Sequence, residues 1–120
     1  RSDLNYGPMP LTLTDMNQYR YMLTEYMLDL EGPRRDGEKW FTVHKIAAIL
    51  CEFVLRVNRE WTGEGKTLFR LFSRYDTILG DRLEAALAAM YRQDDPSALM
   101  AFTEEMLRPY GGKLLIGYEE

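Results

Sequence analysis

Apolar residues recur at three- and four-residue steps along most of the chain, a spacing that places side chains on one face of an α-helix. The first such stripe follows Thr14, a residue type suited to cap a helix N-terminus. It stops before Gly32 and Pro33, which end helices. The apolar members are Met16, Tyr19, Leu23, Tyr26, Met27 and Leu30. A first helix is therefore predicted after an irregular strap over residues 1–13.

A second helix is predicted over residues 38–61, and it carries two apolar faces. One face consists of Val43, Ile46, Ala47, Leu50, Phe53, Val54 and Val57. The other consists of His44, Ala48, Cys51 and Leu55. A helix that is apolar around most of its circumference must be covered by other helices. We therefore expect this helix to be the central element, with Lys45, Glu52, Arg56 and Arg59 on its remaining polar stripe.

Three shorter helices are predicted after the break at residues 62–65. The first carries the apolar cluster at residues 68–72, Asp76 is suited to cap the second, and Asp95-Pro96 is suited to begin the third. Gly111 and Gly112 then end the helical pattern, and the tail over residues 113–120 is expected to pack back on the helices. The chain shows no alternation typical of strands. It predicts an all-α fold, a bundle of four or five helices forming one domain over residues 14–120.

Composition narrows the classes of partner. The formal net charge of -4 and the pI near 5.1 disfavour binding to nucleic acid, which needs a clustered excess of Lys and Arg. A single cysteine, Cys51, excludes an internal disulfide. The longest apolar run, residues 46–51, is too short to span a membrane, so we expect a cytoplasmic protein. Because the chain begins with Arg1, we expect it to be part of a longer polypeptide.

The residues needed for a complete catalytic site are missing from the sequence. His44 is the one histidine, and its position on an apolar helix face predicts a core residue. Cys51 lies two helical turns further along, too far for a thiolate–imidazole contact, and is expected to fill space. The sequence has no metal-binding motif and no phosphate-binding loop. We therefore expect no catalysis, and no cofactor bound, by this chain alone.

The segment at residues 58–66 is the strongest candidate for ligand binding. Arg59 and Lys66 flank a turn with two glycines, and together they can contact phosphate. The alternative is structural: Gly63 and Gly65 cap the preceding helix, Trp61 fills the core, and the cations complement the negative helix end.

Three segments resemble the C-terminal helical region of bacterial nucleotidyltransferase-domain proteins, similar in plan to aminoglycoside adenylyltransferases. The segments are RYMLTEYMLDLEG at residues 20–32, VNRxWxGxGK at residues 57–66, and LxPxGGKL at residues 107–114 followed by Gly117-Tyr118. In that family an N-terminal α/β domain carries a Gly-Ser loop and magnesium-binding aspartates. The helical domain closes the cleft over the nucleotide and shapes the acceptor site.

The resemblance implies an accessory domain of an enzyme that transfers a nucleoside monophosphate to a small hydroxylated acceptor. It implies a nucleotidyltransferase domain as partner in the same polypeptide, with Mg²⁺ and a nucleoside triphosphate as the ligands of the complete protein. Lys66 and Arg59 would contact the triphosphate, and Asn58 would orient the turn. Asp29 and Glu31 would face the acceptor. Taken alone, the sequence explains both residues better as parts of an exposed loop, because acidic residues are common at solvated helix ends.

A different class of function is a freestanding interaction module that forms a homodimer or docks a partner. The apolar surface suspected for this role consists of Trp40, Phe41 and residues 114–118. A HEPN-like ribonuclease is disfavoured, because the short Arg-to-His spacing of that family is missing around His44.

Overall fold

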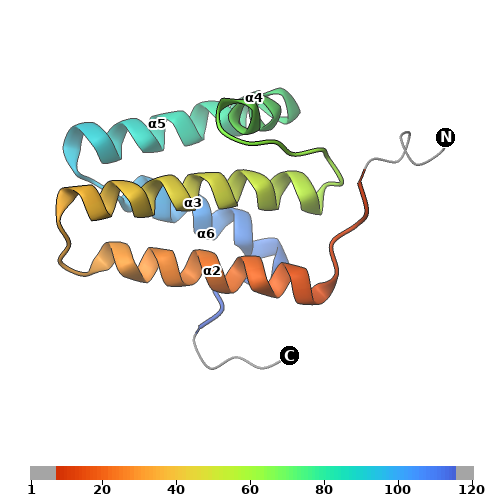
Figure 1. Ribbon diagram of the computed structural model, residues 1–120, viewed down its shortest axis with the longest axis horizontal. Coiled ribbons are helices and arrows are strands. Elements are labelled where there is room, and N and C mark those ends of the chain that lie inside the picture. The colour runs from red at the N-terminus through yellow and green to blue at the C-terminus, as the bar shows by residue number, and fades with distance from the viewer. Residues whose placement is uncertain (1–7, 116–120) are drawn as a thin grey trace.

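The computed structural model of the chain describes residues 8–115, and five α-helices account for most of them (Figure 1). They are α2 (Leu13–Glu31), α3 (Asp36–Val57), α4 (Lys66–Tyr75), α5 (Thr77–Gln93) and α6 (Ser97–Leu107), and the 3₁₀ turn η1 (Arg108–Tyr110) follows α6. Residues 8–115 contain no strand. The predicted all-α bundle is confirmed.

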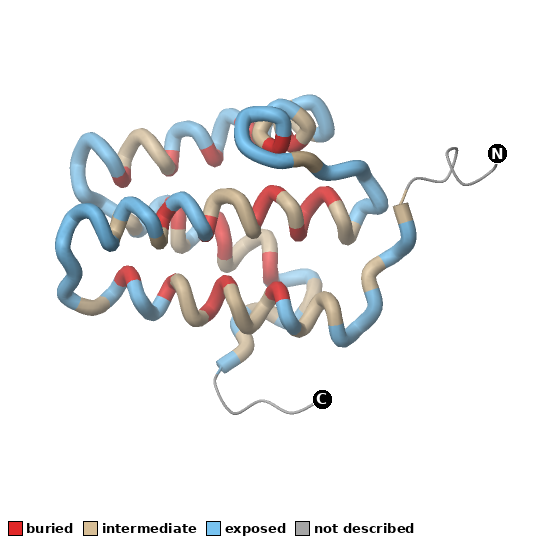
Figure 2. Tube along the Cα trace, viewed as in Figure 1, coloured by how far each residue is buried: buried red, intermediate tan, exposed pale blue. Residues whose placement is uncertain are grey.

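Helix α3 is the central element, as its two apolar faces predict. In Figure 1 it lies between α2 and α5, with α6 behind it and α4 crossing near its C-terminal end. Helix α3 contacts all four of these helices. Figure 2 shows that buried positions on α2 and α3 face each other, whereas the connection between them is exposed.

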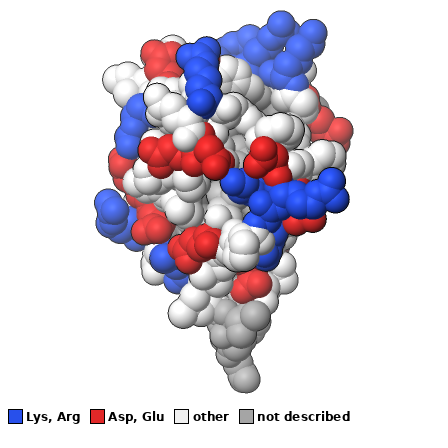
Figure 3. Space-filling view, turned by 90° about the vertical axis from the view of Figure 1, so that its left-hand side faces the viewer, with Lys and Arg blue, Asp and Glu red and all other residues white. Residues whose placement is uncertain are grey.

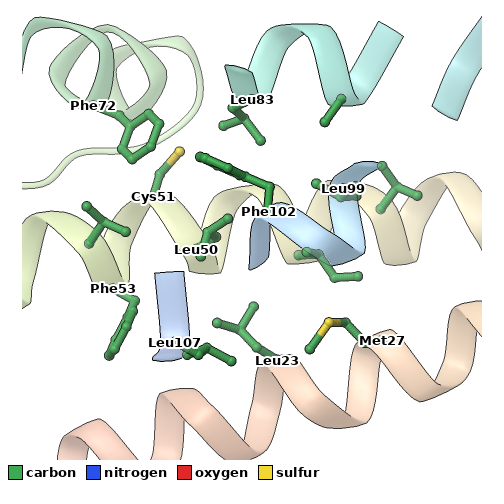
Figure 4. Packing of buried hydrophobic residues seen from close by; sticks show 14 of the residues in the cluster. Leu23, Met27, Leu50, Cys51, Phe53, Phe72, Leu83, Leu99, Phe102 and Leu107 are labelled. Atoms are coloured by element: carbon green, nitrogen blue, oxygen red, sulfur yellow. The ribbon is translucent and has the colours of Figure 1, made fainter. Parts of the chain in front are cut away.

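The core is assembled from the inward faces of all five helices (Figure 4). Leu50 and Phe53 of α3 are fully buried, and Figure 4 shows Leu23 and Met27 of α2 approaching them from one side. From other directions the core receives Phe72, Leu83, Leu99, Phe102 and Leu107. The core is therefore continuous, and its stability comes from burying apolar surface contributed by segments distant in sequence.

The N-terminus of α2 is fixed by Thr12 and not by the predicted Thr14. The hydroxyl of Thr12 accepts a hydrogen bond from the amide of Asp15 at 3.0 Å, and the Asp15 carboxylate accepts one from the amide of Thr12 at 3.4 Å. This reciprocal pair is a capping box. Thr12 and Thr14 are equally suited by residue type to cap the helix. Asp15 decides between them, because it lies three residues after Thr12 and can complete the capping box.

Helix α3 ends at Val57, four residues before the predicted end at Trp61. Arg59 adopts a left-handed conformation with φ of 59°, and the amide of Glu60 donates to the carbonyl of Leu55 at 2.8 Å. This is the Schellman arrangement, in which glycine is the usual left-handed residue. The terminating residue is thus Arg59 rather than Gly63 or Gly65, and Trp61 is 55% exposed rather than part of the core.

Aspartates begin the last two helices. Asp76 accepts hydrogen bonds from the amides of Ile78 and Leu79 at 3.0 and 3.1 Å, which confirms it as the cap of α5. The Asp95 carboxylate accepts from the amide of Ser97 at 3.0 Å. Helix α6 begins at Ser97, so Pro96 lies one position earlier relative to the helix than predicted.

The segment after η1 returns to α2, as expected for the tail. Arg20 Nε donates to the carbonyl of Gly112 at 2.8 Å, and the amide of Leu114 donates to the Thr24 hydroxyl at 2.9 Å. That hydroxyl also donates to the carbonyl of Arg20 at 2.7 Å, so the hydroxyl of the buried Thr24 serves both as a donor and as an acceptor. The later predicted tail residues, 116–120, lie outside the described residues.

Helices α4 and α5 approach closely at Gly80. A Cβ atom at this position would lie 2.9 Å from Ser73 Cβ and 3.0 Å from Ser73 Cα, and would also collide with Ser73 Oγ. In most helices Gly→Ala is favourable by about 1 kcal/mol. Here we expect Gly80→Ala to lower the free energy of unfolding by about 1–3 kcal/mol, because the backbones must separate. Urea denaturation followed by circular dichroism measures this change.

Gly37→Ala provides the matched control, because Gly37 lies in the first turn of α3 and no atom lies within 4 Å of its added Cβ. We expect Gly37→Ala to be neutral or slightly stabilising. Equal effects of the two substitutions would contradict the close approach of α4 and α5.

Candidate functional site

A pocket opens beside the second apolar face of α3 and the adjacent Ala47, which the sequence pattern placed on the first face. Ala47, Ala48 and Cys51 line it from α3, and His44 lies one turn toward the N-terminus of that helix. Alanine side chains end at Cβ, so they leave space that a larger residue would fill. The pocket is therefore a direct result of small residues on the face of α3 that turns toward α4 and α5.

The opposite walls come from α4, α5 and the residue before α4. Leu68 and Phe69 of α4 and Leu83 and Leu87 of α5 line the pocket, and Gly65 lies at its edge. The enclosed volume is about 210 Å³. No lining residue carries a carboxylate, and nearly all of the lining is apolar. Such a surface suits the faces of an uncharged ring better than a polar chain.

His44 is exposed, which corrects its prediction as a core histidine. The helical period does place it on the same stripe as Cys51, but α4 and α5 do not close over this part of α3. The imidazole consequently stands at the pocket, where it is accessible to a ligand. A neutral imidazole offers one hydrogen-bond donor and one acceptor.

Cys51 is buried and points toward Phe72 and Leu83 (Figure 4). Burial raises the pKa of its thiol from 9.0 to about 12, because an apolar environment disfavours the thiolate. The side chain is therefore an uncharged thiol at neutral pH. It acts as an apolar part of the pocket lining rather than as a nucleophile.

Lys66 is the first residue of α4, directly after Gly65 of the pocket edge. The first turn of α4 contains no acidic residue, and Gly65 gives no side-chain cap. The amides of Thr67 and Leu68 already donate to the carbonyls of Glu64 and Gly65. The exposed ammonium of Lys66, which forms no ion pair within residues 8–115, is thus the group available to an anion.

Arg59 and Asn58 lie at the other side of the same connection. Arg59 Nε donates to the carbonyl of Pro8 at 3.0 Å, so this side chain holds the strap before α2. The Asn58 amide donates to the carbonyl of Val54 at 2.8 Å and so completes the last turn of α3. The predicted role of Asn58 in orienting a ligand-binding turn stays a prediction. A phosphate contact by Arg59 stays a prediction.

The predicted acceptor residues lie at the opposite end of the bundle. Asp29 and Glu31 belong to the last turn of α2, beside the start of α3, whereas Lys66 follows the end of α3 (Figure 1). A helix of 22 residues such as α3 separates these ends by about 30 Å, at ~1.5 Å per residue. The structure therefore does not bring the two groups into one site.

Charges of both signs are interspersed on this opposite end (Figure 3). Asp29 forms an ion pair of 3.6 Å with Arg34, and both side chains are largely exposed. Such a surface pair contributes little to stability. Lys39 bonds Asp94 at 3.0 Å and thereby joins the start of α3 to the connection between α5 and α6. An acceptor role for Asp29 and Glu31 stays a prediction, separate from the pocket.

Within residues 8–115, no three His, Cys, Asp or Glu side chains are grouped so that they could hold a metal ion. Helices in the same range are all too short or too polar to cross a membrane.

A scan against protein-family models, a search of curated proteins and a search of solved structures each found no match to this chain. A functional assignment therefore depends on its residues and their geometry. The pocket joins residues from three helices, and sequence reasoning missed it. The one available signal was the run of small residues, Ala47 and Ala48, opposite larger ones.

The uncharged state of Cys51 predicts slow alkylation. In the folded protein at pH 8, we expect iodoacetamide to leave Cys51 unmodified, because the thiol is buried and its pKa of about 12 keeps the thiolate rare. In guanidinium chloride, the same reagent should modify it completely. Mass spectrometry measures both reactions, and fast alkylation of the folded chain would contradict the burial of Cys51.

Proposed function

We propose that this chain is the accessory helical domain of a nucleotidyltransferase, and that it contacts the nucleotide through Lys66. The reaction would transfer a nucleoside monophosphate to a small hydroxylated acceptor. The chain would form one wall of the cleft, whereas the metal-binding aspartates would belong to a separate catalytic domain. The resemblance of residues 20–32, 57–66 and 107–114 to such helical domains supports this assignment.

The observation that carries the proposal is the position of Lys66. A cation at a helix N-terminus faces the positive end of the helix dipole, which is unfavourable unless an anion is nearby. The first turn of α4 supplies no acidic residue. A phosphate group bound here would interact favourably with both the ammonium and the helix end. The arrangement is thus better suited to a liganded state than to the free chain.

The strained backbone of Arg59 gives additional support. A left-handed arginine costs of order 1 kcal/mol where glycine would cost nothing. Its side chain bonds the carbonyl of Pro8, so the strap before α2 is held beside the α3–α4 connection. A cation thus stands at this connection despite a backbone conformation that favours glycine.

Mg²⁺ and the acceptor would be handled elsewhere. The carboxylates within residues 8–115 do not converge with other ligand-forming side chains, so they do not suit an in-line displacement assisted by two metal ions. The proposed partner domain would supply that chemistry. This chain would supply binding energy and orientation for the nucleotide.

Substitution of Lys66 tests the phosphate contact. We expect wild-type protein to bind ATP and inorganic tripolyphosphate, with NMR shifts at the amides of Gly65 and Lys66. Lys66→Ala should weaken both ligands by roughly 1–3 kcal/mol, the scale of a lost charged hydrogen bond, or about 5- to 150-fold in Kd. Titrations followed by ¹H–¹⁵N spectra measure affinities into the millimolar range.

Arg92→Ala serves as the control, because it removes an exposed cation from the last turn of α5, at the other end of the bundle. Its affinity for tripolyphosphate should equal that of wild type. Unchanged binding in Lys66→Ala, or equal losses in both variants, would remove Lys66 from the site.

A second candidate function, self-association or docking of a partner protein, is favoured by two exposed aromatic residues. Trp40 is 49% exposed and Phe41 is 81% exposed, at consecutive positions in the N-terminal half of α3. Large exposed apolar side chains are enriched at interaction sites. Leu115, also exposed, belongs to the tail suspected for this role, whereas residues 116–118 lie outside the described range.

Light scattering tests the dimer form of this second function. A dimer through Trp40 and Phe41 would show twice the monomer mass of 14.1 kDa at high concentration. Phe41→Ala should shift it toward monomer, because an exposed aromatic anchor is lost. Ile78→Ala, which removes an exposed apolar side chain from α5, should not. A constant mass of 14.1 kDa for the wild type would exclude the dimer.

A further inference from the structure

We propose that the pocket between α3, α4 and α5 receives the nucleobase of the nucleotide whose phosphates Lys66 contacts. The proposal extends the function proposed above and depends on it for the identity of the ligand. The pocket itself is defined independently by its lining and volume, so the two ideas can fail separately.

The size of the pocket suits a planar ring system. An apolar cavity of about 150 Å³ holds benzene in a well-studied protein core. The volume here is about 210 Å³, larger by roughly the space of a few ring atoms. A single ring or a fused pair of rings therefore fits, whereas a whole nucleotide does not. The ribose and phosphates would have to remain outside the pocket.

The chemistry of the lining suits a heteroaromatic ring. Leu68, Phe69 and Leu83 provide apolar contact for the ring faces that every nucleobase presents. His44 supplies a hydrogen-bonding group at one side of the pocket, where the polar edge of a base could pair with it. Cys51 adds no charge, because burial keeps its thiol protonated.

The connection between the pocket and Lys66 is direct in the chain. Gly65 lines the pocket and Lys66 is the next residue, so their Cα atoms lie about 3.8 Å apart. A base in the pocket would leave its sugar and phosphates close to the start of α4. An aliphatic side chain from a partner protein would use the apolar walls but would leave His44 and Lys66 without a role.

The experiment separates the base from the phosphates. The protein is labelled with ¹³C at alanine and leucine methyl groups and titrated with adenosine, guanosine, cytidine and uridine, which carry no phosphate. At least one nucleoside should shift the methyl signals of Ala47, Ala48 and Leu83 in a saturable way. Tripolyphosphate, which carries no base, should shift the amides of Gly65 and Lys66 and leave those methyl signals in place.

A matched pair of substitutions then tests the pocket. Ala48→Leu fills it, and Ala85→Leu makes the same change at an exposed position of α5. Ala48→Leu should weaken nucleoside binding by roughly 10-fold or more through steric exclusion. It should leave the affinity for tripolyphosphate unchanged, and Ala85→Leu should affect neither ligand. Thermal unfolding checks that both variants fold. If Ala48→Leu does not fold, the methyl shifts of the wild-type protein decide whether the pocket binds nucleosides.

Each outcome has a defined meaning. If no nucleoside shifts the pocket methyl signals while tripolyphosphate binds through Lys66, the pocket proposal is overturned and the proposed function stands. Indole is titrated in the same way as an apolar ring without a base edge. If indole shifts the methyl signals and no nucleoside does, the pocket accepts apolar rings but not nucleobases, and the proposal is again overturned. If nucleosides bind in the pocket but Lys66→Ala leaves tripolyphosphate affinity unchanged, the pocket is supported and the phosphate contact fails.

Discussion

The burial of α3 on several sides is the constraint on which the rest of the molecule depends. Leu50 and Phe53 are fully buried on this helix, and they require cover from both α2 and the helices after the connection at residues 58–65. The shorter helices gain their stability mainly from packing against α3, since isolated helices of 10 or 11 residues are marginal in water.

The two faces of α3 differ in how well they are filled. The face toward α2 carries large residues such as Ile46 and Leu50, which are fully buried. The face toward α4 and α5 carries Ala47 and Ala48, and a pocket results. Small residues on a helix face usually bring the neighbouring helix closer. Here the neighbours do not close the gap, and this makes the pocket the most distinctive feature of the described surface.

Periodicity predicted the features that depend on local sequence. The number of helices, the central place of α3 and the cap at Asp76 all followed from spacing and residue type. The end of α3 did not, because Arg59 adopts the conformation that glycine usually provides, and no rule of composition favours arginine there. Trp61 was consequently placed in the core, although it lies on the exposed connection.

The candidate site was less predictable than the fold, because it depends on distances between elements. The sequence predicted a phosphate contact at Lys66, and that contact stays a prediction. The pocket beside Lys66 could not be predicted, because it requires α5, which lies more than ten residues further along the chain. The exposure of His44 likewise depends on where α4 and α5 stop covering α3. Helical spacing cannot predict the exposure of His44, because it describes one helix and not the helices that pack against it.

The contact between Gly80 and Ser73 ties together two walls of the pocket. Helices α4 and α5 are joined by the single residue Asp76 and meet closely at this contact. Leu68 of α4 and Leu83 of α5 line the pocket on either side of it. A side chain at position 80 that separates the two helices would therefore also change the shape of the pocket.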